Sequence, residues 1–162
     1  MKAKKILMTI AAVSVLTLSI TGCSSDKNTK DTSGTPQTSQ GSSESNGFQY
    51  YTAEQLKESI EKNEDLYLLD IQTKEDWDKH HIKGAVQTNA YPAKSDKDKA
   101  KLDIVIPSIE ANDNPVVIIC PGGKGGAEKT HAYLVEKGID KDRLFILEKG
   151  QKGWKYDDLL EK

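Results

Sequence analysis

One cysteine in this chain lies where a nucleophile could work. Cys120 directly follows four β-branched apolar residues, Val116–Ile119, which predict a strand buried on both faces. A glycine-rich loop comes next, and an amphipathic run over residues 127–137 predicts a helix. A thiol at this junction lies at the carboxyl edge of a sheet, where open α/β folds place their ligands. It also faces the N–H groups and dipole of a helix N-terminus, which favour the reactive thiolate.

The loop after the cysteine has the composition of an anion cradle. Glycines let the backbone adopt positive φ and turn successive N–H groups toward one small anion, and Lys124 adds a positive charge. From this local pattern two interpretations stay open: an anion-binding loop with a nucleophile, or a small buried side chain before an ordinary turn. On the first interpretation, the substrate-binding residues are Pro121, Gly122, Gly123, Lys124, Gly125 and Gly126.

The rest of the globular part predicts the helices and strands that position this loop. Strands that alternate with helices predict one α/β domain, a parallel sheet flanked by helices on both faces. A capping-box pattern opens the first helix, and Pro107 is expected to break or kink a partly helical region. Helical segments are expected at about 52–62, 73–79, 95–111, 127–137 and 156–160, and strands at 66–71, 85–89, 116–119 and 144–147.

Several motifs, in this order, resemble those of the rhodanese-like domain, the sulfurtransferase module. The likeness runs from about residue 52 to residue 154, the whole globular part. It implies a cysteine nucleophile at position 120 that needs no metal or organic cofactor. It also implies that His81 orders its turn by hydrogen bonds. Asp70, at the end of a predicted strand, is a candidate for bonding loop amides and is expected to be a structural support. The motifs are Asp70-Ile71-Gln72, Glu75 to Trp77, His81-Ile82-Lys83-Gly84-Ala85, the Cys120 loop, and Gly150 with Trp154.

The chain also departs from the family pattern. Gln72 replaces an arginine and Lys83 replaces a proline. Gly125 or Gly126 occupies the place where active transferases usually carry an arginine or another polar residue. Judged from the spacing between Cys120 and Gly138, the loop is expected to be about one residue longer than usual. Longer loops resemble those of phosphatases and arsenate reductases, which need a loop arginine; the only arginine here is Arg143, far along the chain.

Three functions follow from the resemblance. The first is a sulfurtransferase that carries sulfane sulfur as a Cys120 persulfide, taken from a small sulfur-containing anion such as thiosulfate and passed to a thiol, persulfide or cyanide acceptor. The alternative is a non-catalytic binding or sulfur-carrier module. The third is oxyanion chemistry of the phosphatase or arsenate-reductase type. No metal site is expected, because no acidic or cysteine ligands accompany His80 and His81 at ligand spacing.

The N-terminal part predicts export and lipidation. Residues 1–22 have a basic start and a short apolar run, typical of a signal peptide, and Ile20 to Cys23 resembles a bacterial lipobox. Cys23 is the expected lipidation site, and residues 24–46 have the composition of a flexible tether of roughly 25–30 Å. Residues 47–162 would then form the domain, anchored at the outer face of the bacterial cytoplasmic membrane.

The charge balance bears on partners. Removing residues 1–22 takes away three lysines and no acid, so the formal net charge falls from −2 to −5. An acidic domain with well-mixed charges does not favour nucleic acid or anionic lipid. With Cys23 lipidated, Cys120 has no cysteine partner within the chain and should remain a free thiol.

Overall fold

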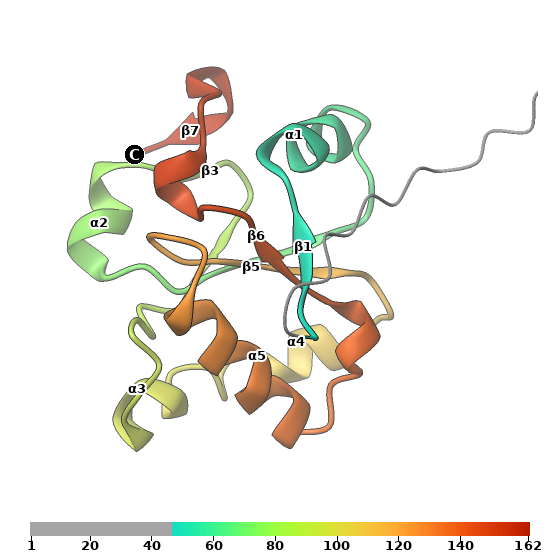
Figure 1. The fold of residues 1–162 in the computed structure, drawn as a ribbon, viewed down its shortest axis with the longest axis vertical. Coiled ribbons are helices and arrows are strands. Elements are labelled where there is room, and N and C mark those ends of the chain that lie inside the picture. Colours follow the sequence, from blue (N-terminus) through green and yellow to red (C-terminus); the bar gives the residue numbers. More distant parts are fainter. Residues whose placement is uncertain (1–46) are drawn as a thin grey trace, which may run out of the picture. The chain divides into compact units, whose positions relative to one another are not determined.

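A five-stranded, wholly parallel sheet forms the centre of the domain in the computed structural model, which describes residues 47–162 (Figure 1). The strand order is β1-β6-β5-β2-β4, so the strand before Cys120 lies in the middle. The predicted α/β class with a parallel sheet is confirmed. The strands are β1 (Gln49–Tyr51), β2 (Tyr67–Asp70), β4 (Val86–Gln87), β5 (Val116–Ile119) and β6 (Leu144–Leu147).

Two apolar clusters show that both faces of the sheet are covered. Side chains alternate along a strand, so Val116 and Ile118 of β5 join one cluster while Val117 and Ile119 join the other. On the first face α4 (Ile106–Glu110) and α5 (Gly125–Glu136) contribute Ile109, Leu134 and other buried side chains. On the second face α1 (Ala53–Glu61) contributes Ala53 and Leu56, together with Trp154 from near the C-terminus. Figure 1 shows these helices on opposite sides of the sheet.

Shorter elements complete the domain. Near the end of the chain β7 (Leu160–Glu161) pairs with β3 (His81–Ile82) in a small antiparallel sheet. This pairing connects the C-terminus to the segment after α2 (Lys74–Lys79). Within residues 47–162, no helix combines the length and apolar character needed to cross a bilayer. The short elements are α2 (Lys74–Lys79), β3 (His81–Ile82), α3 (Asp96–Ala100), three 3₁₀ turns (Lys141–Arg143, Gln151–Gly153 and Asp157–Leu159) and β7 (Leu160–Glu161).

Local sequence signals explain where several helices begin and end. The capping box at Thr52 is confirmed, since the Thr52 side chain accepts the Gln55 N–H and the Gln55 side chain accepts the Thr52 N–H. Gly138 follows α5 with φ of +98°, the left-handed conformation expected just beyond a helix. Pro107 does not kink a helix. It lies in the first turn of α4, where its missing N–H costs nothing, and the region 95–111 holds two short helices.

One edge of the parallel sheet and the start of α5 also differ from the prediction. The edge strand β1 was not expected; it pairs in parallel with β6 and places Gln49 beside Phe145. Helix α5 begins at Gly125, two residues before the predicted start. The loop between Cys120 and α5 therefore comprises residues 121–124.

Candidate active site

Cys120 lies directly after β5, and the alternation of side chains along this strand turns its thiol toward α5. Its side chain belongs to the same apolar cluster as Ile118 and Leu134, and the residue is 1% exposed. The Gly123 N–H donates a hydrogen bond to Sγ at 3.1 Å, and the thiol lies 3.9 Å from the Lys124 carbonyl oxygen. The expected contact between sulfur and a loop amide is therefore present at Gly123. A sulfur anion in this position would be stabilised by that N–H and by the N-terminus of α5.

Residues 150–152 hold the cysteine loop in place through backbone hydrogen bonds. The Gln151 N–H donates to the Cys120 carbonyl at 2.9 Å, and the Lys152 N–H donates to the Pro121 carbonyl at 3.1 Å. Gly150 has φ of +56°, and a Cβ there would lie 2.0 Å from the Cys120 carbonyl oxygen. A Cβ at Gly123, φ +67°, would lie 2.6 Å from the Leu147 carbonyl oxygen. The two backbone segments can approach this closely because both positions are glycine.

The two glycines in the first turn of α5 differ in the room that they leave for a side chain. A Cβ at Gly126 would lie 2.8 Å from the ring of Tyr91 and 3.5 Å from the Ile71 side chain. A Cβ at Gly125 would meet only the flexible Lys129 ammonium, at 3.5 Å. The two candidate places for a loop arginine are therefore not equivalent, since only Gly125 has room for a side chain.

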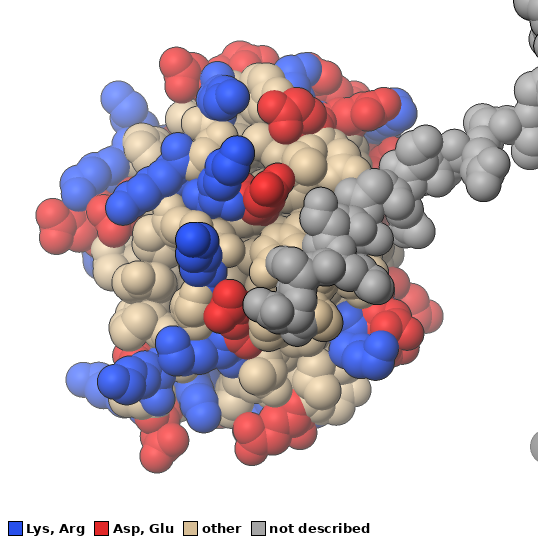
Figure 2. All heavy atoms as spheres, in the orientation of Figure 1, with Lys and Arg blue, Asp and Glu red and all other residues tan. Residues whose placement is uncertain are grey.

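The remaining loop residues are more exposed. Lys124 and Gly122 are exposed at the tip, and nothing lies within 4 Å of a Cβ built on Gly122. Figure 2 shows lysine side chains over the part of this face where α2, α3 and the loop after β5 lie, with acidic side chains among them. This arrangement gives a small anion a locally attractive approach in a domain whose overall charge is negative.

Asp70 lies at the end of β2, next to β5, and its carboxylate is fully buried. One oxygen accepts the Gln72 N–H at 2.7 Å and the other accepts the Gln72 side-chain amide at 3.0 Å. The loss of hydration on burial raises the pKa of Asp70 to about 6, although these hydrogen bonds oppose the rise. Asp70 therefore supports the turn after β2, and it holds Gln72, which stands where the family motif has an arginine.

The raised pKa of Asp70 predicts a measurable pH dependence of stability. Its folded pKa lies above the unfolded value of about 3.9, so its contribution is complete below about pH 4 and is lost as the pH rises through 6. We expect the difference in unfolding free energy between Asp70→Asn and the parent to change by about 2–3 kcal/mol between pH 4 and pH 7, in favour of the variant at pH 7. The measurement is the free energy of unfolding from urea curves at both pH values. A difference between the two proteins that does not change with pH would contradict this origin of the shift.

The two neighbouring histidines serve different parts of the structure. The His81 ring stacks on Trp77 with centroids 3.6 Å apart, and its Nδ1 lies 3.2 Å from the Trp77 carbonyl oxygen. His80 points instead toward Gln151, with Nδ1 3.3 Å from the Gln151 Nε2. His81 is therefore placed to order its turn by hydrogen bonding, the role that the resemblance implied. Among residues 47–162, no group of three or more histidine, cysteine or acidic side chains could hold a metal ion.

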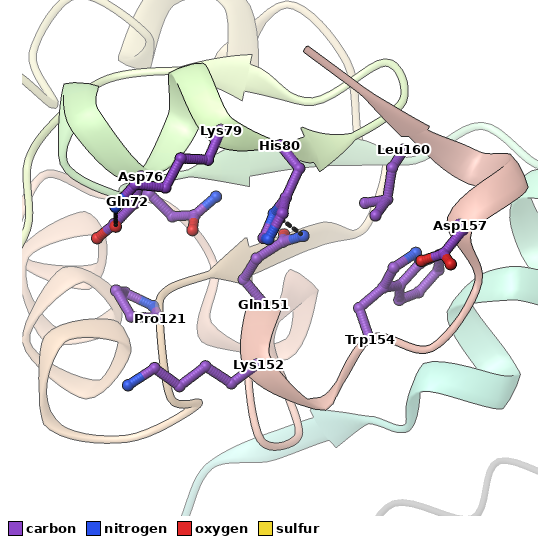
Figure 3. A pocket seen from close by; sticks show the side chains of 10 residues that line it. All are labelled: Gln72, Asp76, Lys79, His80, Pro121, Gln151, Lys152, Trp154, Asp157 and Leu160. Carbon is purple, nitrogen blue, oxygen red and sulfur yellow. Dashed lines mark hydrogen bonds and ion pairs between the residues drawn. The ribbon is translucent and has the colours of Figure 1, made fainter.

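A pocket of about 330 Å³ beside the loop was not foreseen from the sequence (Figure 3). Pro121, the residue after Cys120, forms part of its wall, although Cys120 itself does not line it. Gln72 brings the first family motif into the same wall, and Trp154 brings the last. The lining residues are Gln72, Asp76, Lys79, His80, Pro121, Gln151, Lys152, Trp154, Asp157 and Leu160.

The family assignment follows from this fold and from the order of the motifs around Cys120. The rhodanese-like domain model matches residues 52–157, and the chain therefore belongs to the rhodanese-like family. No curated protein sequence matches it significantly.

Solved structures support the same fold. The rhodanese-like domain of an Anabaena protein aligns with a TM-score of 0.53 at 19% identity, over 69% of this chain and 77% of that one. A Staphylococcus saprophyticus protein aligns with 0.50 at 23% identity, over 70% and 98%. The As-Sb reductase of Leishmania major aligns with 0.54 at 15% identity, over 68% and 83%. At these identities the likeness concerns the fold alone.

Proposed function

We propose that this protein is a sulfurtransferase that carries sulfane sulfur on Cys120. The observation that supports this most is the Cys120 Sγ at the end of β5, accepting the Gly123 N–H at 3.1 Å in front of α5. In the loading step the thiolate attacks the outer sulfur of thiosulfate, an S–S bond forms to Cys120, and sulfite leaves with the electron pair of the broken bond. The product is the persulfide Cys120–S–S⁻, which carries one negative charge.

The second half-reaction regenerates the thiolate. Cyanide attacks the terminal sulfur of the persulfide, the bond to the Cys120 sulfur breaks, and thiocyanate leaves while Cys120 recovers its negative charge. The backbone N–H at Gly123 and the N-terminus of α5 are available to stabilise sulfur anions in both half-reactions. No side-chain acid or base is required, because no proton moves in either transfer.

The decisive experiment is intact-mass measurement after incubation with thiosulfate. The protein should carry Cys23→Ser so that Cys120 is its only cysteine. We expect a mass gain of one sulfur atom that a reducing thiol removes, followed by thiocyanate release when cyanide is added. A protein that gains no sulfur from thiosulfate or from polysulfide is not a sulfur carrier at Cys120.

The alternative, a non-catalytic binding module, is favoured by two observations. Cys120 is only 1% exposed, and the loop offers no guanidinium to attract a donor. For catalysis, the donor must therefore approach past the exposed tip formed by Gly122 and Lys124. Alkylation of the native protein by iodoacetamide separates the two functions, since a binding module with an inert thiol would react only after unfolding.

The third function, oxyanion chemistry, is the least supported, because the loop lacks the arginine that such enzymes need to hold a multiply charged oxyanion. Arg143 cannot supply it, because its guanidinium donates to the carbonyls of Ile109 and Asn114, and Asn114 precedes β5 at the opposite edge of the sheet. We therefore expect no hydrolysis of aryl phosphates by the unmodified protein.

A matched pair of substitutions tests how the loop would hold a larger anion. Gly125→Arg should fold like the parent and should gain thermal stabilisation by phosphate or sulfate, because a side chain at this position meets only Lys129. Gly126→Arg should lose about 1–3 kcal/mol of unfolding free energy through overpacking against Tyr91 and Ile71. Thermal unfolding with and without phosphate measures both effects. Equal stability of the two variants would show that the Tyr91 side chain can move aside at little cost in free energy.

We further propose that the domain acts outside the cytoplasm, held at the membrane by lipid on Cys23. The sequence of residues 1–23 supports this proposal, although that segment lies outside the described residues. We expect Cys23→Ser to move most of the protein from the membrane fraction to the soluble fraction or the medium, while the parent stays in the membrane fraction. Fractionation of expressing cells measures the shift. Unchanged membrane retention of the variant would rule out the lipid anchor.

A further inference from the structure

The pocket beside the cysteine loop contains a buried acceptor that lacks a donor. Gln151 is 4% exposed and lines the pocket, and its Oε1 accepts no hydrogen bond from any described residue. Its Nε2 lies 3.3 Å from His80 Nδ1, which accepts that donor in the tautomer with hydrogen on Nε2. A buried amide oxygen without a donor is costly. A ligand that donates an N–H to Gln151 Oε1 would remove this cost.

The charged groups on the side of the pocket near the cysteine loop balance one another. Figure 3 shows Asp76, Lys79 and Lys152 on this side. Lys79 pairs with Asp76 at 3.1 Å and with Glu75 at 3.5 Å. A hydrogen bond from Lys79 and the charge of Lys152 both lower the pKa of Asp76. Two lysines and two acids therefore lie together here, and their formal charges cancel.

On the other side of the pocket one carboxylate has no cation to balance it. Figure 3 shows Asp157 beside Trp154 on this side, and both residues line the pocket. Within residues 47–162, the Asp157 carboxylate takes part in no hydrogen bond and no ion pair. The neighbouring Asp158 differs, because it acts on Lys57, whose pKa is raised mainly by Glu61 and further by Asp158. Asp157 thus contributes an unbalanced negative charge, and an aromatic ring beside a carboxylate attracts organic cations.

We propose that this pocket binds a small organic amine in its protonated form, independently of the sulfur chemistry of Cys120. The ammonium group donates an N–H to Gln151 Oε1 and is attracted by the Asp157 carboxylate. The apolar body of the amine packs against Trp154 and Leu160. Because Asp157 is exposed, the ammonium keeps part of its hydration, and its transfer costs less than the full burial of a charge. The volume of about 330 Å³ is at the lower end for ligand pockets and suits a small molecule.

The proposed amine site does not include the nucleophile. The Cys120 thiol belongs to the apolar cluster on the α5 side of the sheet and does not line the pocket. The pocket residues Gln151 and Lys152 reach the cysteine loop only through backbone hydrogen bonds, to the carbonyls of Cys120 and Pro121. Amine binding and sulfur loading can therefore be measured separately, and the failure of either one leaves the other intact.

Selectivity for charge is the first test. The probes are 2-phenylethylamine, the neutral alcohol 2-phenylethanol and the anion phenylacetate, titrated into the full chain carrying Cys23→Ser. Binding is followed by NMR at the Trp154 indole N–H, which donates to the Tyr156 carbonyl at 2.9 Å. We expect the amine to bind about tenfold more tightly than the alcohol, the anion to bind more weakly than both, and added salt to weaken the amine. Equal affinity for amine and alcohol, or tighter binding of the anion, would overturn the proposal.

A matched pair of substitutions locates the amine within the pocket. Asp157→Asn and Asp158→Asn each remove one negative charge from the same exposed turn, but only Asp157 lines the pocket. We expect Asp157→Asn to weaken amine binding about two- to fivefold and Asp158→Asn to leave it unchanged. An equal loss in the two variants would mean that the amine responds only to the general charge of the domain, which contradicts the site.

The buried amide is tested by Gln151→Leu. We expect amine binding to weaken about tenfold, because the ligand loses the acceptor of its hydrogen bond. The melting temperature should not fall, since the substitution also removes a buried oxygen that has no partner in the unliganded protein. Amine binding by Gln151→Leu as tight as that of the parent would show that Oε1 does not hold the ligand.

Discussion

Cys120→Ser should abolish both sulfur loading and thiocyanate formation. Serine nearly preserves the volume of the side chain and the contact with the Gly123 N–H, but its hydroxyl does not form a persulfide. Intact mass after incubation with thiosulfate and colorimetric detection of thiocyanate measure the two half-reactions. Both should fall to the level without protein, because Cys120 is the only thiol that residues 47–162 contain.

The control is the same protein with Cys120 intact, compared by near-ultraviolet circular dichroism and thermal unfolding. Because the residue is 1% exposed and packed among apolar side chains, a modest loss of stability is expected in the variant. A folded Cys120→Ser protein that still transfers sulfur as fast as the parent would remove the proposed mechanism.

Gly150→Ala should be the most destabilising methyl addition in the site. The new Cβ would lie 2.0 Å from the Cys120 carbonyl oxygen and 2.5 Å from the Gly123 nitrogen, so the two backbone segments must separate. The backbone there, φ +56° and ψ −156°, is also a conformation that only glycine adopts readily. Strain and overpacking together should cost on the order of 3 kcal/mol or more of unfolding free energy. Sulfur loading should fall as well, because the hydrogen bond from Gln151 to Cys120 cannot survive the separation.

Gly84→Ala is the matched control for this substitution. Gly84 has φ of +78°, but nothing lies within 4 Å of a Cβ built on it, so the conformational cost of about 1–2 kcal/mol appears there without a clash. Urea unfolding of both variants separates the two effects. If Gly150→Ala costs no more than Gly84→Ala, the close contact with Cys120 is not a significant constraint on the loop.

Much of the fold could be predicted because its signals are local. Four apolar β-branched residues defined β5, and Thr52 with Gln55 defined the start of α1. In contrast, β1 has only three residues, Gln49–Tyr51, and its pairing with β6 joins positions almost a hundred residues apart. The start of α5 at Gly125 was missed for a related reason. Two glycines disfavour a helix locally, but the packing of Gly126 against Tyr91 and Ile71 allows one.

The candidate site, like the fold, could be predicted from the sequence only in part. The position of Cys120 and the support from Asp70 followed from residue types at the ends of predicted strands, and the family motifs drew attention to Gly150. What no local pattern could reveal is that Gly150 touches the Cys120 carbonyl, or that Gln151 is buried with an unpaired oxygen. The first fact depends on how two segments thirty residues apart meet, and the second on how Gln151 lies against His80, 71 residues away in the chain. Glutamine next to glycine in a loop gives no sign of either.

Some loop positions have room for a side chain and others do not, and this difference has a consequence for engineering. The backbone bonds from Gln151 and Lys152 fix the path of the loop, and they involve no side chain of the loop itself. Positions 122 and 125 accept a Cβ, whereas positions 123 and 126 do not. A combinatorial library that varies only Gly122, Lys124 and Gly125 would therefore explore new anion specificities on an unchanged scaffold. The loop positions that can be varied are thus different from the glycine positions that fix the backbone.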